Sequence, residues 1–371
     1  MEIVRLLEKD RQQIIEETIG QALTMPFWTQ RFGEDIEIRL KLDMDRNFEV
    51  LIQSIRYRSP MIFEDHTRWR RDQIQGFGCA SGHLREMYGH LWQAIARRLP
   101  EYWHSTVGDY FQAALDGLIY PGAAAQALLK QQTLLAEDLA AATFDRYWHW
   151  QAAYGTDGRP QLLYDLWYLL DYLVDALGVN SSATLGSHLQ WLRQRLRERG
   201  LSTAHVQQLA WLLMAVLEAR LDPGTVEKAR HLLLEGMGRL SYPNENCRAI
   251  ESAQSEVIGR VASHLIAAGF APNDPDTAVE VSWYTAYLVD SLAVNAPEPL
   301  LGYAQWVQQW LESQGLPDGP LRLSLERLGE ALQHVVPEQV TREAAGILSV
   351  VRRALQMELQ STAPEGSHGP V

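Results

Sequence analysis

The chain has 371 residues, 46% of them hydrophobic, which is enough apolar sequence for packed cores in two or three domains. Its 46 acidic and 33 basic residues leave a formal charge of −13, which argues against broad binding of nucleic-acid phosphates. The two cysteines, Cys79 and Cys247, provide no disulfide framework, and no apolar run is long enough to span a bilayer as a helix. We therefore expect a cytoplasmic protein with no membrane insertion and no nucleic-acid partner.

The first stretch, residues 1–120, is expected to be a helical module. A candidate metal site lies in it, because His83, Glu86 and His90 stand at positions i, i+3 and i+7 and share one helix face. Two imidazoles and a carboxylate are a ligand set for zinc or iron. The alternative is a solvated or partly buried helix face, since the apolar stripe of this helix runs beside the histidines.

The second stretch, residues 121–242, shows apolar residues at helical spacing throughout. Helices are predicted over 134–154, 162–177, 185–199 and 203–217, and another begins at Asp222-Pro223. Gly200 is placed to end the third of these as a left-handed cap. No alternating β-branched run of strand length interrupts the pattern, so the predicted fold class is all-α.

The third stretch, residues 243–358, repeats the second. The segment 287–295 matches 172–180 in seven of nine positions at an offset of 115 residues, both segments beginning Tyr-Leu-Val-Asp. A fainter match at an offset of 122 relates 66–83 to 188–205, and the Tyr120-Pro121 and Tyr242-Pro243 steps are also 122 apart. We predict three tandem helical-bundle modules of about five helices each, at 1–120, 121–242 and 243–358, and a disordered tail at 359–371.

Aromatic residues gather where the first helix of the second module is predicted to end. His149 stands between Trp148 and Trp150, and His264 is its counterpart at the 115-residue offset. An imidazole within aromatic walls is typical of an axial haem ligand or of a stack on a flat chromophore. These four residues are therefore the candidate cofactor site, for which a tetrapyrrole is the candidate ligand. A core histidine with a backbone partner is the alternative.

A tryptophan recurs in the helix that follows, as Trp69, Trp191 and Trp306. A large aromatic side chain that repeats at one position of an amphipathic helix is typical of a core residue. We therefore expect Trp191 and Trp306 to be buried.

The last two modules resemble a family through these same segments. Leu185–Leu201, its counterpart 301–316 and the Tyr-Leu helices before them resemble the helical module that accompanies cobalamin-binding domains in bacterial sensory and regulatory proteins. The resemblance implies a helical bundle that acts in regulation or in covering a ligand. The chain has no Asp-x-His-x-x-Gly motif of the cobalamin-binding domain, so the resemblance carries over no ligand residue.

These patterns favour a non-enzymatic regulatory or interaction scaffold that binds a protein partner along stacked modules. The second hypothesis is a sensor or carrier that holds a flat hydrophobic ligand between helices. An enzyme that uses the His83 cluster is the third. No phosphate-binding loop, serine-nucleophile elbow or His-Glu-x-x-His helix is present in the sequence.

Overall fold

A computed structural model describes residues 2–270 and 275–362, and in these residues every regular element is a helix. The predicted all-α class is therefore confirmed. The chain divides into two compact units, residues 1–191 with 212–236 and residues 192–211 with 237–371. These units are coarser than the three predicted modules, whose boundaries stay a prediction.

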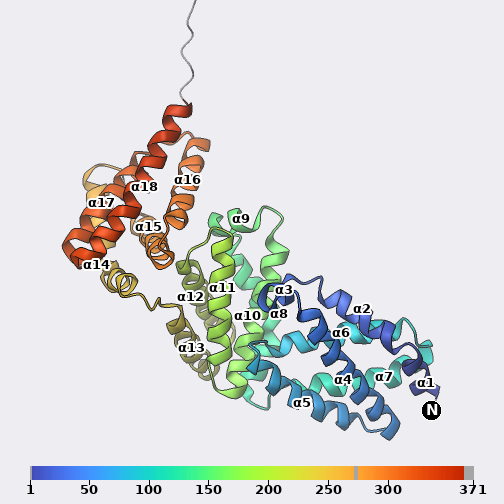
Figure 1. Ribbon diagram of the computed structural model, residues 1–371. Helices are drawn as coiled ribbons and strands as arrows, with labels where there is room; N and C mark the ends of the chain where they lie inside the picture. The colour runs from blue at the N-terminus through green and yellow to red at the C-terminus, as the bar shows by residue number, and fades with distance from the viewer. Residues whose placement is uncertain (1, 271–274, 363–371) are drawn as a thin grey trace, which may run out of the picture. The chain divides into compact units, whose positions relative to one another are not determined.

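Helices α1 to α10 belong to the first unit (Figure 1). They are α1 (Glu2–Lys9), α2 (Arg11–Ala22), α3 (Pro26–Phe32), α4 (Ile36–Tyr57), α5 (Pro60–Gly76), α6 (Ser81–Ala96), α7 (His104–Gly117), α8 (Ala123–Thr143), α9 (Trp148–Tyr154) and α10 (Arg159–Val179). Helices α11 (Ala183–Glu198) and α12 (Thr203–Arg220) contribute to both units, and α13 (Pro223–Met237) falls almost wholly in the first.

The second unit is completed by α14 (Glu245–Ala267), α15 (Pro275–Val294), α16 (Glu298–Ser313), α17 (Gly319–Val335) and α18 (Glu338–Thr362). Helix α18 extends into the stretch for which a disordered tail was predicted, and residues 363–371 lie outside the described part. Within this unit α14 packs on α15 and α17, and α17 packs on α18. Apolar side chains from all of these helices are buried, as the amphipathic patterns predict.

Helix ends recur at the offsets found in the sequence. Helices α4, α10 and α15 each end at a residue in the left-handed region, and helices α5, α11 and α16 are each followed by a glycine there. The left-handed residues are Arg58, Asn180 and Asn295, with φ of 52°, 53° and 52°, and Gly78, Gly200 and Gly315, with φ of 76°, 81° and 66°. A left-handed residue lets the chain leave a helix while the last carbonyls keep backbone partners, so the sequence repeat is also a repeat of local structure.

Two short helices, α3 and α9, were not predicted from the sequence. Helix α3 and helix α9 both have seven residues, stand 122 positions apart and end at a glycine with positive φ, Gly33 and Gly155. Each follows a longer helix from which only a few residues separate it. Stretch 1–120 therefore contains α1 to α7, more than the five helices expected. Seven residues give too few turns for a periodic pattern to stand out.

The tyrosines at the two predicted boundaries are buried. The hydroxyl of Tyr120 is hydrogen-bonded by the side-chain amide of Gln75, and the Arg71 guanidinium lies 4.0 Å from the centre of the Tyr120 ring. Arg193 lies in the same way 4.6 Å from the ring centre of Tyr242. Each tyrosine ring thus lies against an arginine guanidinium, which forms a cation–π contact at both boundaries.

Candidate functional site

The predicted metal ligands do not come together as a metal-binding group, and no set of three such side chains does so within the described residues. The His83 ring is buried between the rings of Phe27 and Tyr168, with centroids at 4.1 and 4.4 Å, and its Nδ1 lies 3.1 Å from the Ala80 backbone. Burial lowers the pKa of His83 to about 3, so this histidine is neutral. Glu86 instead accepts hydrogen bonds from tyrosine hydroxyls, and His90 Nε2 is 3.7 Å from Glu86 Oε1.

The predicted cofactor residues lie in two different environments. His149 and Trp150 are buried in α9, and burial lowers the pKa of His149 to about 4. His264 is exposed on α14, where its Nδ1 lies 2.8 Å from the Arg260 carbonyl oxygen of the same helix. The side chain of Trp148 lies outside the described residues. The aligned histidines therefore do not share one setting, and the tetrapyrrole site at this position stays a prediction.

The strongest repeated feature is a buried carboxylate that receives the start of a distant helix. Asp175 of α10 accepts the Ser81 backbone N–H at 2.7 Å and the Ser81 hydroxyl at 2.6 Å, and Tyr172 donates to the Gly78 carbonyl at 2.9 Å. Ser81 is the first residue of α6, so the carboxylate satisfies a backbone donor that the helix itself leaves unpaired. We call Gly78, Ser81, Tyr172 and Asp175 the first corner.

The second unit holds the same arrangement at the repeat offsets. Asp290 of α15 accepts the Thr203 backbone N–H at 2.8 Å and its hydroxyl at 2.7 Å, while Tyr287 donates to the Gly200 carbonyl at 2.7 Å. The Tyr242 hydroxyl also donates to Asp290 at 2.7 Å. We call Gly200, Thr203, Tyr287 and Asp290 the second corner. The motif Gly-x-x-Ser/Thr-x-His on one side therefore meets Tyr-x-x-Asp on the other in both units.

Burial dominates the electrostatics of both corners. It raises the pKa of Asp175 to about 7, against which the hydrogen bonds from Ser81 act, and it raises the pKa of Asp290 as well. With a pKa of about 7, the Asp175 carboxyl gains or loses its proton near neutral pH, and this change affects the hydrogen bonds that it accepts at the start of α6. The corners hold distant helices together.

The two corners differ in one neighbouring pair. In the first, Gly82 faces Asp171, and a Cβ on Gly82 would overlap that carboxylate. Asp171 is fully buried and pairs with Arg85 at 3.0 Å. The equivalent positions beside the second corner are Ala204 and Ala286. The first corner therefore has a glycine and a buried carboxylate where the second has two alanines, which distinguishes the two helix pairings.

The recurring tryptophans are less buried than expected. Trp191 and Trp306 are half-buried, and Trp69 is 52% exposed. Trp191 is covered by α3, since the Phe27 ring lies 5.4 Å from it edge-on and the Arg31 guanidinium lies 5.8 Å from its centre. The predicted core role of Trp191 and Trp306 is thus only partly correct, because both side chains stay partly exposed.

A groove opens beside Trp69 in the first unit. It has a volume of about 600 Å³ and lies among α3, α4, α5 and α6. Three exposed apolar side chains continue it onto the surface, namely Leu42 (64% exposed), Trp69 and Phe77 (65%). Two buried donors on lining residues, Trp28 Nε1 and Arg70 Nε, have no hydrogen-bond partner in the described part of the chain. This groove has the size and mixed lining of a ligand-binding site.

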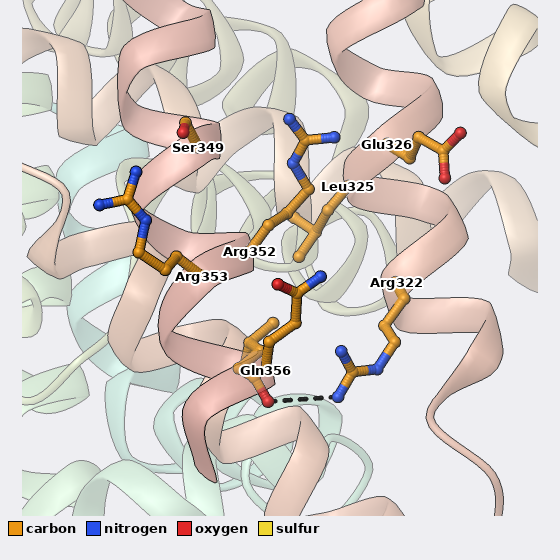
Figure 2. A pocket seen from close by; sticks show the side chains of 8 residues that line it. Arg322, Leu325, Glu326, Ser349, Arg352, Arg353 and Gln356 are labelled. Atoms are coloured by element: carbon orange, nitrogen blue, oxygen red, sulfur yellow. Dashed lines mark hydrogen bonds between the residues drawn. The ribbon is translucent and has the colours of Figure 1, made fainter. Parts of the chain in front are cut away.

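A second cavity of about 440 Å³ lies between α17 and α18 (Figure 2). Arg322 donates to the Leu355 carbonyl at 3.2 Å and pairs with Asp318 at 2.7 Å. Figure 2 shows the Arg352 guanidinium between the two helices, whereas that of Arg353 points away from it. The three guanidinium groups therefore do not converge on one position, as an anion clamp requires.

No family model, no curated protein and no solved structure matches the chain. Within the described residues, no helix is both long and apolar enough to cross a lipid bilayer.

Proposed function

We propose that this protein is a non-enzymatic interaction scaffold, and that the groove beside Trp69 is where it binds a protein partner. The observation that carries the proposal is the continuous apolar surface formed by Leu42, Trp69 and Phe77 at the mouth of the groove. Large apolar side chains that lie exposed together are typical of interaction sites, whereas single exposed ones are common on any surface. Tryptophan is also among the residues that most often dominate binding energy.

The architecture supports the same function. The first corner joins α6 to α10 through buried hydrogen bonds, and α6 also lines the groove. A site on packed helices loses less conformational freedom on binding than a flexible loop does. The regulatory role implied by the resemblance agrees with a scaffold of this kind.

Comparative affinity capture from the native host tests the proposal. Trp69→Ala is compared with wild type and with Trp211→Ala, because Trp211 is another exposed tryptophan at 57%. We expect a protein that wild type and Trp211→Ala retain in equal amounts and that Trp69→Ala loses, with the thermal stability of all three alike. A retained set that does not depend on Trp69 would remove the groove from the proposal.

A flat hydrophobic ligand is the second candidate, and the aromatic lining of the groove favours it. Trp28, Phe32, Trp69 and Phe77 provide aromatic faces, and Arg39 is one of three arginines in the lining. Arginines suit a ligand with carboxylate groups, such as a tetrapyrrole. The absorption spectrum of protein purified from its native host distinguishes the candidates: a visible band that Trp69→Ala removes supports the ligand, and a colourless protein supports the scaffold.

A further inference from the structure

The groove beside Trp69 lies on α4 and α5, which correspond to α10 and α11 in the sequence repeat. On α10 and α11, the corresponding surface is contacted by α3. Four residues of α10 and α11 contact α3 or Met25, which directly precedes it, and Figure 1 shows α3 beside these two helices. These residues are Tyr164, which contacts Met25; Tyr168, which stacks on Phe27 at 6.5 Å; Ser187, which accepts from Arg31 at 3.2 Å; and Trp191. Their counterparts at the 122-residue offset are Leu42, Arg46, Asp65 and Trp69.

Three of these four counterparts, Leu42, Arg46 and Trp69, line the groove. The helices that carry them also correspond, since α4 and α5 stand 122 positions before α10 and α11. These three residues of the groove therefore stand at positions that α3 and Met25 contact on α10 and α11. The two surfaces differ in what contacts the tryptophan. Phe27 and Arg31 of α3 lie against Trp191, whereas Trp69 is 52% exposed.

We propose that the groove binds a short helix of the α3 type from a partner protein, with one aromatic side chain set between Arg46 and Trp69 and an apolar side chain before it against Leu42. This inference rests on the proposed function and names the class of partner. Helix α3 defines the chemistry, with an aromatic residue at the place of Phe27 and a basic residue one turn later, Arg31. In the groove the aromatic ring meets the Arg46 guanidinium instead of Tyr168, and an arginine is equally suited to an aromatic face. The basic residue meets Asp65 in place of Ser187.

The occupant comes from a different protein. Helix α3 is already packed within its own chain, through both a hydrogen bond and ring contacts. In the second unit, α14 continues unbroken to Ala267 through most of the positions that correspond to α9, so this unit has no separate short helix there. Helix α9, the other short helix of this type, has its His149 and Trp150 buried and carries Ala153 where α3 has Arg31. A second copy of the chain therefore has no unengaged helix with the chemistry of α3 to offer.

The probe is a fluorescent peptide with the sequence of residues 22–34. We expect saturable binding to the full-length protein, equal for wild type and Trp211→Ala. Binding should weaken about tenfold or more with Trp69→Ala or Leu42→Asp, because an aromatic anchor and its pocket carry most of the affinity of such contacts. Both positions are more than half exposed, so neither change should affect folding. A peptide with Phe27→Ala should lose binding to the same extent.

The outcomes separate the inference from the proposed function. Peptide binding that is equal in wild type, Trp69→Ala and Leu42→Asp, or absent up to about 1 mM, overturns the α3-type partner. If affinity capture still shows a partner that depends on Trp69, and the peptide does not displace it, the proposed scaffold function is supported and the α3-type partner is excluded. Displacement of that partner by the peptide, but not by its Phe27→Ala form, supports both.

Discussion

Removing the carboxylate of the first corner should destabilise the protein through two orphaned donors. Asp175→Ala leaves the backbone N–H and the hydroxyl of Ser81 buried with no acceptor, where the wild type holds them at 2.7 and 2.6 Å. An unpaired buried donor costs about 1–3 kcal/mol, so two cost about 2–6 kcal/mol. Relief of the buried carboxylate offsets part of this, and we expect a loss of about 2–4 kcal/mol.

Asp175→Asn separates hydrogen bonding from charge. Burial raises the pKa of Asp175 to about 7, so the folded state holds the proton more tightly than the unfolded state does. The stability that this group contributes is fully present below its ordinary pKa, near 4, and is lost as the pH rises through about 7. Three pH units correspond to at most about 4 kcal/mol, and the asparagine variant lacks this dependence.

The assay is denaturant unfolding of wild type, Asp175→Ala and Asp175→Asn between pH 5 and 8, combined with amide hydrogen exchange at the start of α6. Asp109→Ala, which changes an exposed carboxylate of the same unit, is the control and should change stability by less than about 0.5 kcal/mol. With rising pH, the stability of Asp175→Asn should gain on that of wild type. A constant difference across this range, or an unchanged exchange rate at Ser81 in Asp175→Ala, would refute the role given to this carboxylate.

Three other predictions follow from single contacts. Burial lowers the pKa of His149 to about 4, so the neutral ring takes up a proton on unfolding, and wild type should lose stability as the pH falls from about 6.5 towards 4. His149→Phe should remove this loss, which acid titration followed by circular dichroism measures. Gly82→Ala should cost about 1–3 kcal/mol by overlap with Asp171, and Asp171→Ala should restore part of it in a double-mutant cycle. Trp191→Ala should cost about 2–4 kcal/mol in thermal unfolding and Trp69→Ala under about 1, and equal losses would contradict the difference in cover.

The sequence predicted the helices and their ends far better than it predicted which distant helices contact each other. The repeat around Tyr172 and Tyr287 correctly indicated equivalent helices, because helical spacing and glycine caps depend on neighbouring residues. The role of Asp175 was missed, since its partner Ser81 is 94 positions away and no pattern along one helix shows it. The paired motifs Tyr-x-x-Asp and Gly-x-x-Ser/Thr-x-His were the available signal. Tyr-x-x-Asp repeats at an offset of 115 residues and Gly-x-x-Ser/Thr-x-His at an offset of 122.

The surroundings of the candidate site residues could not be predicted for a related reason. His83 was expected at the flank of a helix, but Phe27 and Tyr168 enclose it from helices far apart in the sequence. His149 corresponds to Phe27 and Trp150 to Trp28 at the 122-residue offset, so both belong to the short-helix motif. Spacing along one helix predicts which side chains share a face, and the covering element then decides whether that face is a site, a core or an interface.

The residues beside the groove also indicate what kind of partner it takes. At the 122-residue offset the positions of Tyr172 and Asp175 are occupied by Val50 and Gln53, so α4 has no carboxylate to receive the start of another helix. A further helical module docked through a corner would need that carboxylate, because the corner satisfies a buried backbone donor. The α4–α5 surface keeps only Leu42, Arg46 and Trp69, the counterparts of the residues on α10 and α11 that contact Met25 and α3. Such a surface selects a short aromatic helix over a complete module, and this is the partner that the peptide experiment tests.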